Sequence, residues 1–91
     1  MNFEWDTNKA ESNLRKHGVS FQEASTVFGD ELSITVYDPD HSRNEDRYIT
    51  IGLSEQRRFL LISHTEREDR IRIISARELS PRERKDYEEE I

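Results

Sequence analysis

Arginine side chains and a histidine concentrate in the stretch from His64 to Arg77. In the strand predicted in this stretch, Arg70 and Arg72 point to one face and the isoleucines beside them to the other, because strand side chains alternate with a period of two. Arg67 lies in the preceding turn and Arg77 at the far end of the strand. One interpretation is a cationic surface for a phosphodiester, with His64 in reach. The other is a solvated face balanced by neighbouring acids, which the charge pattern alone favours.

A second group of polar residues lies in the predicted loop between residues 38 and 46. It supplies carboxylates and one imidazole, which hold hard divalent ions when they converge. The spacing matches no established metal site, and loops favour these residue types in any case, so we expect no metal here. The candidate ligands are Asp38, Asp40, His41, Glu45 and Asp46.

Two further segments have alternative interpretations. Lys16 and His17 precede Gly18 at a predicted helix end, where cations complement the helix dipole and bond the last carbonyl groups. The alternative is a contribution to a basic cleft. Tyr87 either brings a phenol near a substrate or packs together with Ile91, four residues later. The residues alone favour the structural interpretation for both segments.

The composition narrows the class of protein. The chain has 91 residues, 37% of them charged and 32% hydrophobic, which fits a single domain over residues 1–91 with a thin core. It has no cysteine, which excludes disulfides, thiolate zinc sites and cysteine nucleophiles. No apolar run is long enough to span a bilayer, and the first residues do not resemble a signal peptide, so we expect a cytoplasmic protein. The net charge is −6, yet residues 43–84 carry ten arginines against eight acids, a local charge of +2.

Helix signals dominate the first third of the chain, after a short aromatic segment at residues 3–5 that predicts an edge strand. Asp6 is a candidate N-cap for a helix that runs to His17, with Ala10 and Leu14 on its inner face. A second helix is predicted from the capping box of residues 20–23 to about residue 29. Its inward side chains are expected to be Phe21, Ala24, Val27 and Phe28.

The rest of the chain reads as strands followed by one helix. Four strands separated by short polar turns predict an antiparallel meander, at residues 33–37, 47–53, 58–65 and 70–76. Ser80 and Pro81 then mark the start of a C-terminal helix. Only Tyr87 and Ile91 give that helix an apolar stripe, so we expect it to fray or to be held by a partner. The predicted fold class is α+β.

Several runs occur together in an order that is specific as a combination. The first part of the chain contributes residues 3–6, 13–21 and 23–24, with their lysine-histidine-glycine run. The middle contributes residues 40–42, 45–48 and 51–52. The end contributes residues 64–67, the isoleucine-serine-alanine-arginine run within residues 71–77, residues 83–84, and Tyr87. In this combination the chain resembles the BrnT-type toxins.

The resemblance implies a RelE-like fold with an antiparallel sheet and flanking helices, and an activity that cleaves RNA and inhibits translation without a cofactor. It also implies a BrnA-type antitoxin with a ribbon-helix-helix DNA-binding domain. The complex would repress its own operon as a heterotetramer, with DNA contacted only through the antitoxin. The antitoxin is expected to cover the edge strand near Phe3 and the final helix.

Metal-independent RNA cleavage uses the 2′-hydroxyl as nucleophile and needs a base, an acid and cations. His64 is the candidate acid or base, and Glu66 is the rival base. The phosphate-stabilising candidates are Arg67, Arg72 and Arg77. Further RNA contacts are predicted for Lys16, His17, Arg47, Arg70 and Tyr87. The alternative function is a noncatalytic or degenerate binding module that acts only as the partner of a DNA-binding repressor.

Overall fold

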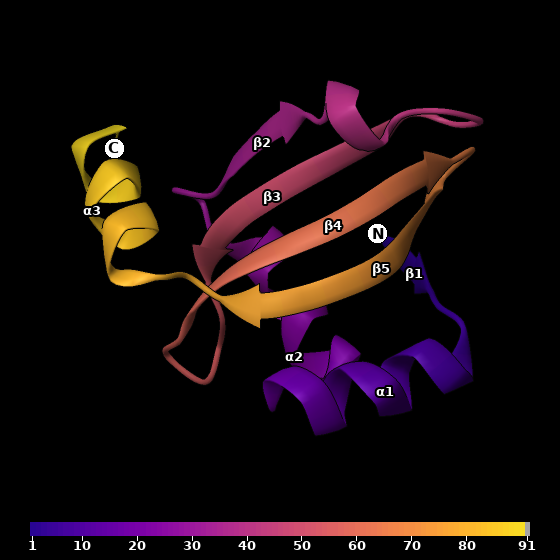
Figure 1. Cartoon of the computed structure of the whole chain (residues 1–91), viewed down its shortest axis with the longest axis horizontal. Coiled ribbons are helices and arrows are strands. Elements are labelled where there is room, and N and C mark those ends of the chain that lie inside the picture. Colours follow the sequence, from indigo (N-terminus) through magenta and orange to yellow (C-terminus); the bar gives the residue numbers. More distant parts are fainter. Residues whose placement is uncertain (91) are drawn as a thin grey trace.

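Five strands form one sheet, with two helices packed against one face and a third helix at one end (Figure 1). The computed structural model describes residues 1–90. The strands are β1 (Asn2–Glu4), β2 (Ile34–Tyr37), β3 (Arg47–Leu53), β4 (Phe59–Arg67) and β5 (Arg70–Glu78). The helices are α1 (Thr7–His17), α2 (Phe21–Thr26) and α3 (Pro81–Glu90), with short 3₁₀ helices at Val27–Gly29 and Pro39–His41. The predicted α+β class is confirmed.

The sheet is mixed, and its strands run in the order β1-β5-β4-β3-β2. Strands β2 to β5 form the predicted antiparallel meander. β1 pairs in parallel with β5, with Phe3 opposite Ile71, so the sheet has five strands rather than about four and is not wholly antiparallel. A hairpin turn forces neighbouring strands to be antiparallel. β1 and β5 are far apart in the sequence, so no local pattern fixes their relative direction.

The predicted limits of α1 are confirmed, but its inner face differs from the prediction. Asp6 accepts a backbone N–H of the first turn at 3.1 Å, and Gly18 ends the helix with a φ of 68°. Leu14 is 52% exposed, whereas Asn13 is buried. The Asn13 side chain donates to the carbonyl of Ala76 and accepts its N–H. β1 pairs only with the first residues of β5 and does not reach Ala76. The side-chain amide of Asn13 therefore takes the hydrogen bonds of the Ala76 backbone, which a leucine would leave unpaired.

α2 and the 3₁₀ helix after it supply the centre of the core. Ser20 caps α2 by accepting the N–H of Glu23 at 3.0 Å. The predicted inward residues Phe21, Ala24 and Val27 are fully buried, and Phe28 packs against them. They meet the apolar side chains of β4 and β5, which are Leu60, Ile62, Ile71, Ile73 and Ala76.

An ion pair between a buried carboxylate and a partly exposed guanidinium joins α2 to the turn between β3 and β4. The carboxylate of Glu23, 3% exposed, accepts from the Nε of Arg58 at 3.0 Å and from the hydroxyl of Ser54 at 2.7 Å. The guanidinium also donates to the carbonyl of Gly18 at 3.0 Å. The hydrogen bond from Arg58 lowers the pKa of the Glu23 carboxyl. The predicted capping box is therefore only half formed, because its glutamate binds Arg58 rather than the backbone of Ser20.

α3 packs on the sheet end through Tyr87, which is 4% exposed. The Tyr87 hydroxyl donates to the carbonyl of Leu32 at 2.8 Å, its ring lies 5.8 Å from that of Phe59, and burial raises the pKa of its phenol. Ser80 and Glu83 form the complete capping box, with bonds of 3.2 and 2.9 Å. The predicted partner of Tyr87 in the apolar stripe, Ile91, lies outside the described residues. No helix within residues 1–90 has the length and apolar character needed to cross a membrane.

Candidate functional site

The face of the sheet opposite α1 and α2, here called the open face, carries most of the predicted arginines. Strand register places Arg47 beside Thr65, Thr65 beside Arg72, and Arg72 beside Glu4. These four neighbours come from β3, β4, β5 and β1, so one row crosses most of the sheet. In Figure 1, α2 lies behind the strands and leaves the opposite face uncovered.

A β-bulge in β5 brings Arg77 to the open face. The register between β4 and β5 shifts by one residue between Ser63 and His64. Before the bulge Ile73 is buried against the helices, and after it Ala76 is buried instead. The alternation therefore changes phase within the strand. Without the bulge, Arg77 would share the buried face with Ile73.

A cavity of about 510 Å³ lies on the open face beside Arg77. The end of α1, the loop after β2, strands β3 to β5 and the start of α3 all contribute to its wall. Three predicted site residues meet here, namely His17, Arg47 and Arg77. The remaining lining residues are Asp38, His41, Ile49, Leu61, Ser63, Ser75, Ala76 and Glu83. Two imidazoles and two guanidinium groups thus border a single hollow.

His41 is the strongest candidate for proton transfer in this cavity. Its Nδ1 lies 2.8 Å from the Asp38 carboxylate, and the His41 side chain is 67% exposed while that of Asp38 is 12% exposed. A carboxylate bonded to one ring nitrogen orients the imidazole and leaves the other nitrogen for a substrate. Ser42 braces the loop, because its hydroxyl donates to the Asp38 carbonyl at 2.6 Å and accepts the Arg47 N–H at 2.8 Å.

Arg77 is held at the cavity wall by Glu83. Two hydrogen bonds of 2.8 and 3.0 Å join the guanidinium to the carboxylate. The hydrogen bond from Arg77 lowers the pKa of the Glu83 carboxyl to about 2, and the same bond raises the pKa of Arg77. Glu83 belongs to the first turn of α3, so the position of that helix fixes the guanidinium.

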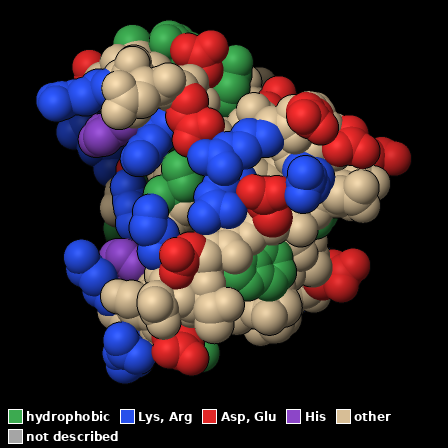
Figure 2. All heavy atoms as spheres, turned by 90° about the vertical axis from the view of Figure 1, so that its right-hand side faces the viewer, with side chains coloured by type: hydrophobic (Ala, Val, Ile, Leu, Met, Phe, Trp, Pro, Cys, Tyr) green, Lys and Arg blue, Asp and Glu red, His purple; other side chains and the backbone are tan. Residues whose placement is uncertain are grey.

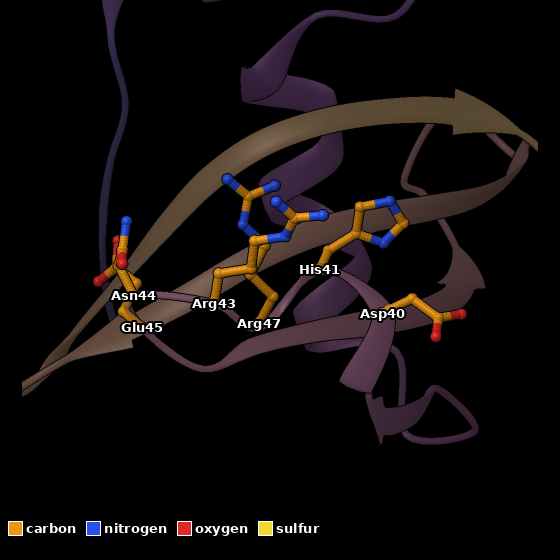
Figure 3. Close-up of a pocket in the computed structure, with 6 residues that line it drawn as sticks. All are labelled: Asp40, His41, Arg43, Asn44, Glu45 and Arg47. Atoms are coloured by element: carbon orange, nitrogen blue, oxygen red, sulfur yellow. The ribbon is translucent and has the colours of Figure 1, made fainter.

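A second hollow of about 420 Å³ surrounds the loop of residues 40–47 (Figure 3). His41 and Arg47 line both hollows, so the two lie side by side. In Figure 3 the side chains of Arg43, Arg47 and His41 point to the same side of the loop, while Asp40 points away. The cationic surface of the cavity therefore extends along this loop by one further guanidinium.

Three arginines near the β4–β5 turn surround one carboxylate. Glu4 lies 2.9 Å from Arg72, 3.2 Å from Arg70 and 4.0 Å from Arg67. Arg67 also pairs with Glu45 at 2.8 Å, and this hydrogen bond lowers the pKa of the Glu45 carboxyl. Figure 2, which faces this side of the molecule, shows basic and acidic side chains interleaved. The predicted arginines share a surface, but Glu4 and Glu45 offset much of their charge.

His64 lies on the other face of the sheet, which corrects its predicted place beside the arginines. It is 1% exposed, and its Nε2 lies 2.8 Å from the Thr50 hydroxyl. Its ring contacts Phe28 edge-on at 5.0 Å and stacks on Tyr48 at 6.0 Å. Burial lowers its pKa to about 4. A side chain enclosed in this way has no access to a substrate on the open face.

Three further predicted residues stand outside the cavity. Glu66 pairs in register with Ile71, whose side chain faces the helices, so Glu66 points away from the arginines at the exposed strand end. Lys16 is exposed in the last turn of α1 but does not line the cavity, in contrast to its neighbour His17. Tyr87 is buried in the packing of α3, where its hydroxyl already donates its proton to the carbonyl of Leu32.

The Asp38–His41 pair is the feature that the sequence interpretation missed. From the sequence, both residues are candidates only for metal ligation. Pro39 begins a single 3₁₀ turn between them, and residues three apart in such a turn lie on the same side. The sequence signal for this pair is an aspartate followed by a proline and, three residues after the aspartate, a histidine. Within residues 1–90, no three histidine, aspartate or glutamate side chains are grouped as a metal site would require.

Comparison with known proteins agrees with this architecture. The family model for the ribonuclease toxin BrnT of type II toxin–antitoxin systems matches residues 5–83. The fold is similar to the crystal structure of the Brucella abortus ribonuclease toxin BrnT, with a TM-score of 0.65 and 22% identity over 88% of this chain and 97% of that one. A comparison with curated proteins gives no match.

The fold is thus shared with a ribonuclease toxin of known structure, and the class is that of the toxins of type II toxin–antitoxin systems. The chain belongs to the BrnT family, because the family model covers most of its length. This confirms the resemblance found in the sequence. Membership also implies a protein antitoxin as partner.

Proposed function

We propose that this chain is a RelE-like endoribonuclease that cleaves messenger RNA in the cytoplasm without a metal ion and so inhibits translation. The observation that carries the proposal is the meeting of the Asp38–His41 pair with the Arg47 and Arg77 guanidinium groups around one cavity. An oriented imidazole moves protons near neutral pH, and paired guanidinium groups bind a phosphate. The net charge of −6 is that of the whole chain, whereas the contact with RNA is proposed at the cavity to which Arg47 and Arg77 both contribute.

In the proposed reaction the 2′-hydroxyl of the RNA attacks the adjacent phosphorus. His41, oriented by Asp38, accepts the hydroxyl proton through Nε2 as the O2′–P bond forms. His17, from the end of α1, donates a proton to the 5′-oxygen as the P–O5′ bond breaks. The products are a 2′,3′-cyclic phosphate and a 5′-hydroxyl end, and one proton enters the protein for each one that leaves.

The arginines stabilise the charge that develops on the phosphorus oxygens. Arg77 is fixed by its two bonds to Glu83, and Arg47 begins β3 beside the braced loop. Donors fixed before the reaction stabilise a transition state most effectively, since they need no reorganisation. Arg72 lies in the same row as Arg47 and extends the RNA-binding surface towards Arg70.

Cleavage of an end-labelled messenger RNA in EDTA tests the proposal. The wild-type chain is expected to cleave, and both His41→Gln and the double variant Arg47→Ala, Arg77→Ala are expected to lose at least about 100-fold in rate. Arg82→Ala is the matched control, because Arg82 is an exposed arginine of α3 outside the cavity. Equal loss in the control would contradict the assignment of the site.

We further propose a BrnA-type ribbon-helix-helix antitoxin that forms a heterotetramer with this chain, binds the operator DNA and represses the operon. Mass measurement of the purified complex tests the stoichiometry and is expected to give two copies of each chain. The alternative, a noncatalytic or degenerate module, predicts repression with the antitoxin but no cleavage by the free chain with added magnesium or ribosomes. Cleavage in EDTA by the wild-type chain would eliminate that alternative.

A further inference from the structure

An apolar groove of about 450 Å³ lies between β2 and α3. Its floor is formed by Ile34, Val36 and Ile51, and Tyr87 forms part of its wall. Val36 is 50% exposed, and Leu32, just before the strand, is 60% exposed. Exposed apolar side chains gathered along one groove are typical of a surface that another chain covers.

The groove runs beside a free strand edge. Within residues 1–90, β2 ends the sheet and pairs with β3 alone. The outer N–H and C=O groups of such a strand are a template for one more strand. An extended segment laid along β2 would gain main-chain hydrogen bonds, and every second side chain would enter the groove.

The rim of the groove is acidic. Glu83, Asp86 and Glu90 line it from α3. Glu83 is paired with Arg77, whereas among the described residues no lysine or arginine lines the groove beside Asp86 and Glu90. This wall is complementary to lysine and arginine side chains and repels an RNA backbone, so the groove favours a protein segment over the nucleic acid substrate.

We infer that this groove binds the antitoxin through an extended segment that pairs with the outer edge of β2, inserts apolar side chains over Val36 and presents basic side chains to α3. The inference rests on the proposed function for the consequence of binding. Glu83 lines both the groove and the cavity. A segment bound there therefore contacts the helix that holds Arg77, and the antitoxin is expected to inhibit cleavage.

Affinity for the purified full-length antitoxin, measured by calorimetry, tests the inference. Val36→Asp places a charge in the groove and is expected to weaken binding by at least about 30-fold. Leu14→Asp is the matched control, because Leu14 is 52% exposed on α1, away from the groove, and its variant is expected to bind within about twofold of wild type. Both variants are checked for an unchanged melting temperature.

A second variant keeps the test valid if Val36→Asp disturbs the folding of β2. Asp86→Lys changes an exposed position of α3 and is expected to weaken binding by about tenfold at low salt, with a smaller effect at high salt. Hydrogen exchange is expected to show protection of the amides of β2 when the antitoxin is bound. Unchanged affinity in Val36→Asp and Asp86→Lys, or protection of α1 in place of β2, would overturn the inference.

The same samples separate this inference from the proposed function. RNA cleavage by free Val36→Asp and Leu14→Asp is expected to match that of the wild-type chain, since neither residue lines the cavity. A wild-type chain that binds the antitoxin through β2 but cuts no RNA would refute the ribonuclease assignment and leave the docking surface standing. A wild-type chain that cuts RNA but binds the antitoxin at another surface would support the ribonuclease assignment and refute the docking surface.

Discussion

Glu83 holds Arg77 through two hydrogen bonds of 2.8 and 3.0 Å, and this pair connects α3 to the open face of the sheet. The two residues are six apart in sequence but belong to different elements. The guanidinium of Arg77 therefore depends on the docking of α3 for its orientation. A helix that the sequence describes as weak thus acts as a support for the candidate site.

Glu83→Gln is expected to lower the cleavage rate about tenfold and to destabilise the fold by about 1 kcal/mol at pH 7. The loss of stability is small because the side chains of Arg77 and Glu83 are 41% and 33% exposed, so that solvent screens the pair. A carboxyl whose folded pKa is depressed contributes stability above its ordinary pKa and loses it as pH falls. The difference in stability between wild type and variant is therefore expected to shrink from pH 4.5 towards the folded value of about 2. Urea denaturation across this range measures it, with Glu88→Gln as control for an exposed pair.

Asp38→Asn tests whether Asp38 orients His41. The amide keeps the shape of the side chain but removes the negative charge beside Nδ1. We expect a loss of about 10- to 100-fold in the cleavage rate with a shift in its pH profile, and little change in RNA affinity. Asp40→Asn, on the side chain that points away in Figure 3, is the control. A pH profile identical to that of wild type would show that the pair has no role in proton transfer.

Arg58→Met is expected to destabilise the fold by about 3–5 kcal/mol, because it leaves the carboxylate of Glu23 buried without its ionic partner. The double variant Arg58→Met, Glu23→Leu removes both charges and is expected to recover a large part of that loss. Thermal and urea unfolding measure both. If the double variant were as unstable as the single one, the cost would come from lost packing rather than from the unpaired charge.

His64 makes stability depend on pH through its burial. Its folded pKa is about 4, below the ordinary value of 6.5, so the unfolded chain binds the proton more readily between these values. Stability is therefore expected to fall as pH drops from 6.5 to 4, by on the order of 3 kcal/mol for this group. His64→Gln retains a hydrogen-bonding group near Thr50 and does not titrate, so its unfolding curve is expected to vary less over this range. An unchanged slope would assign the pH dependence to other groups.

Glu4→Gln is expected to raise the affinity for RNA. Glu4 lies within ion-pair distance of Arg67, Arg70 and Arg72, and its neutralisation leaves these cations free for phosphates. We expect about a threefold gain at low salt that decreases as salt increases, because screening weakens exposed charges. Filter binding to a noncleavable RNA measures it. Weaker binding would show that Glu4 positions the arginines rather than competing with the phosphate.

The sequence determined the helices and strands because the patterns that mark them lie within a few residues. Asp6 and Gly18 mark the ends of α1, and period-two alternation marks β3. Helix-capping hydrogen bonds and the alternation of apolar and polar side chains act within a few residues, so they can be recognised without knowledge of the rest of the chain. The run of arginines also identified the charged strand, and its combination with other runs identified the family.

The tertiary structure decided which of those residues meet. His64 is buried because it continues the helix-facing alternation of β4 after Leu60 and Ile62, whereas the bulge in β5 turns Arg77 to the open face. The bulge depends on the pairing of β5 with β4, and the parallel pairing of β1 with β5 depends on the packing of α1 against the sheet. Neither feature can be recognised from a short stretch of sequence. His41 gained its role in the same way, because only the folded loop brings its imidazole and Asp38 to a cavity built by five other elements.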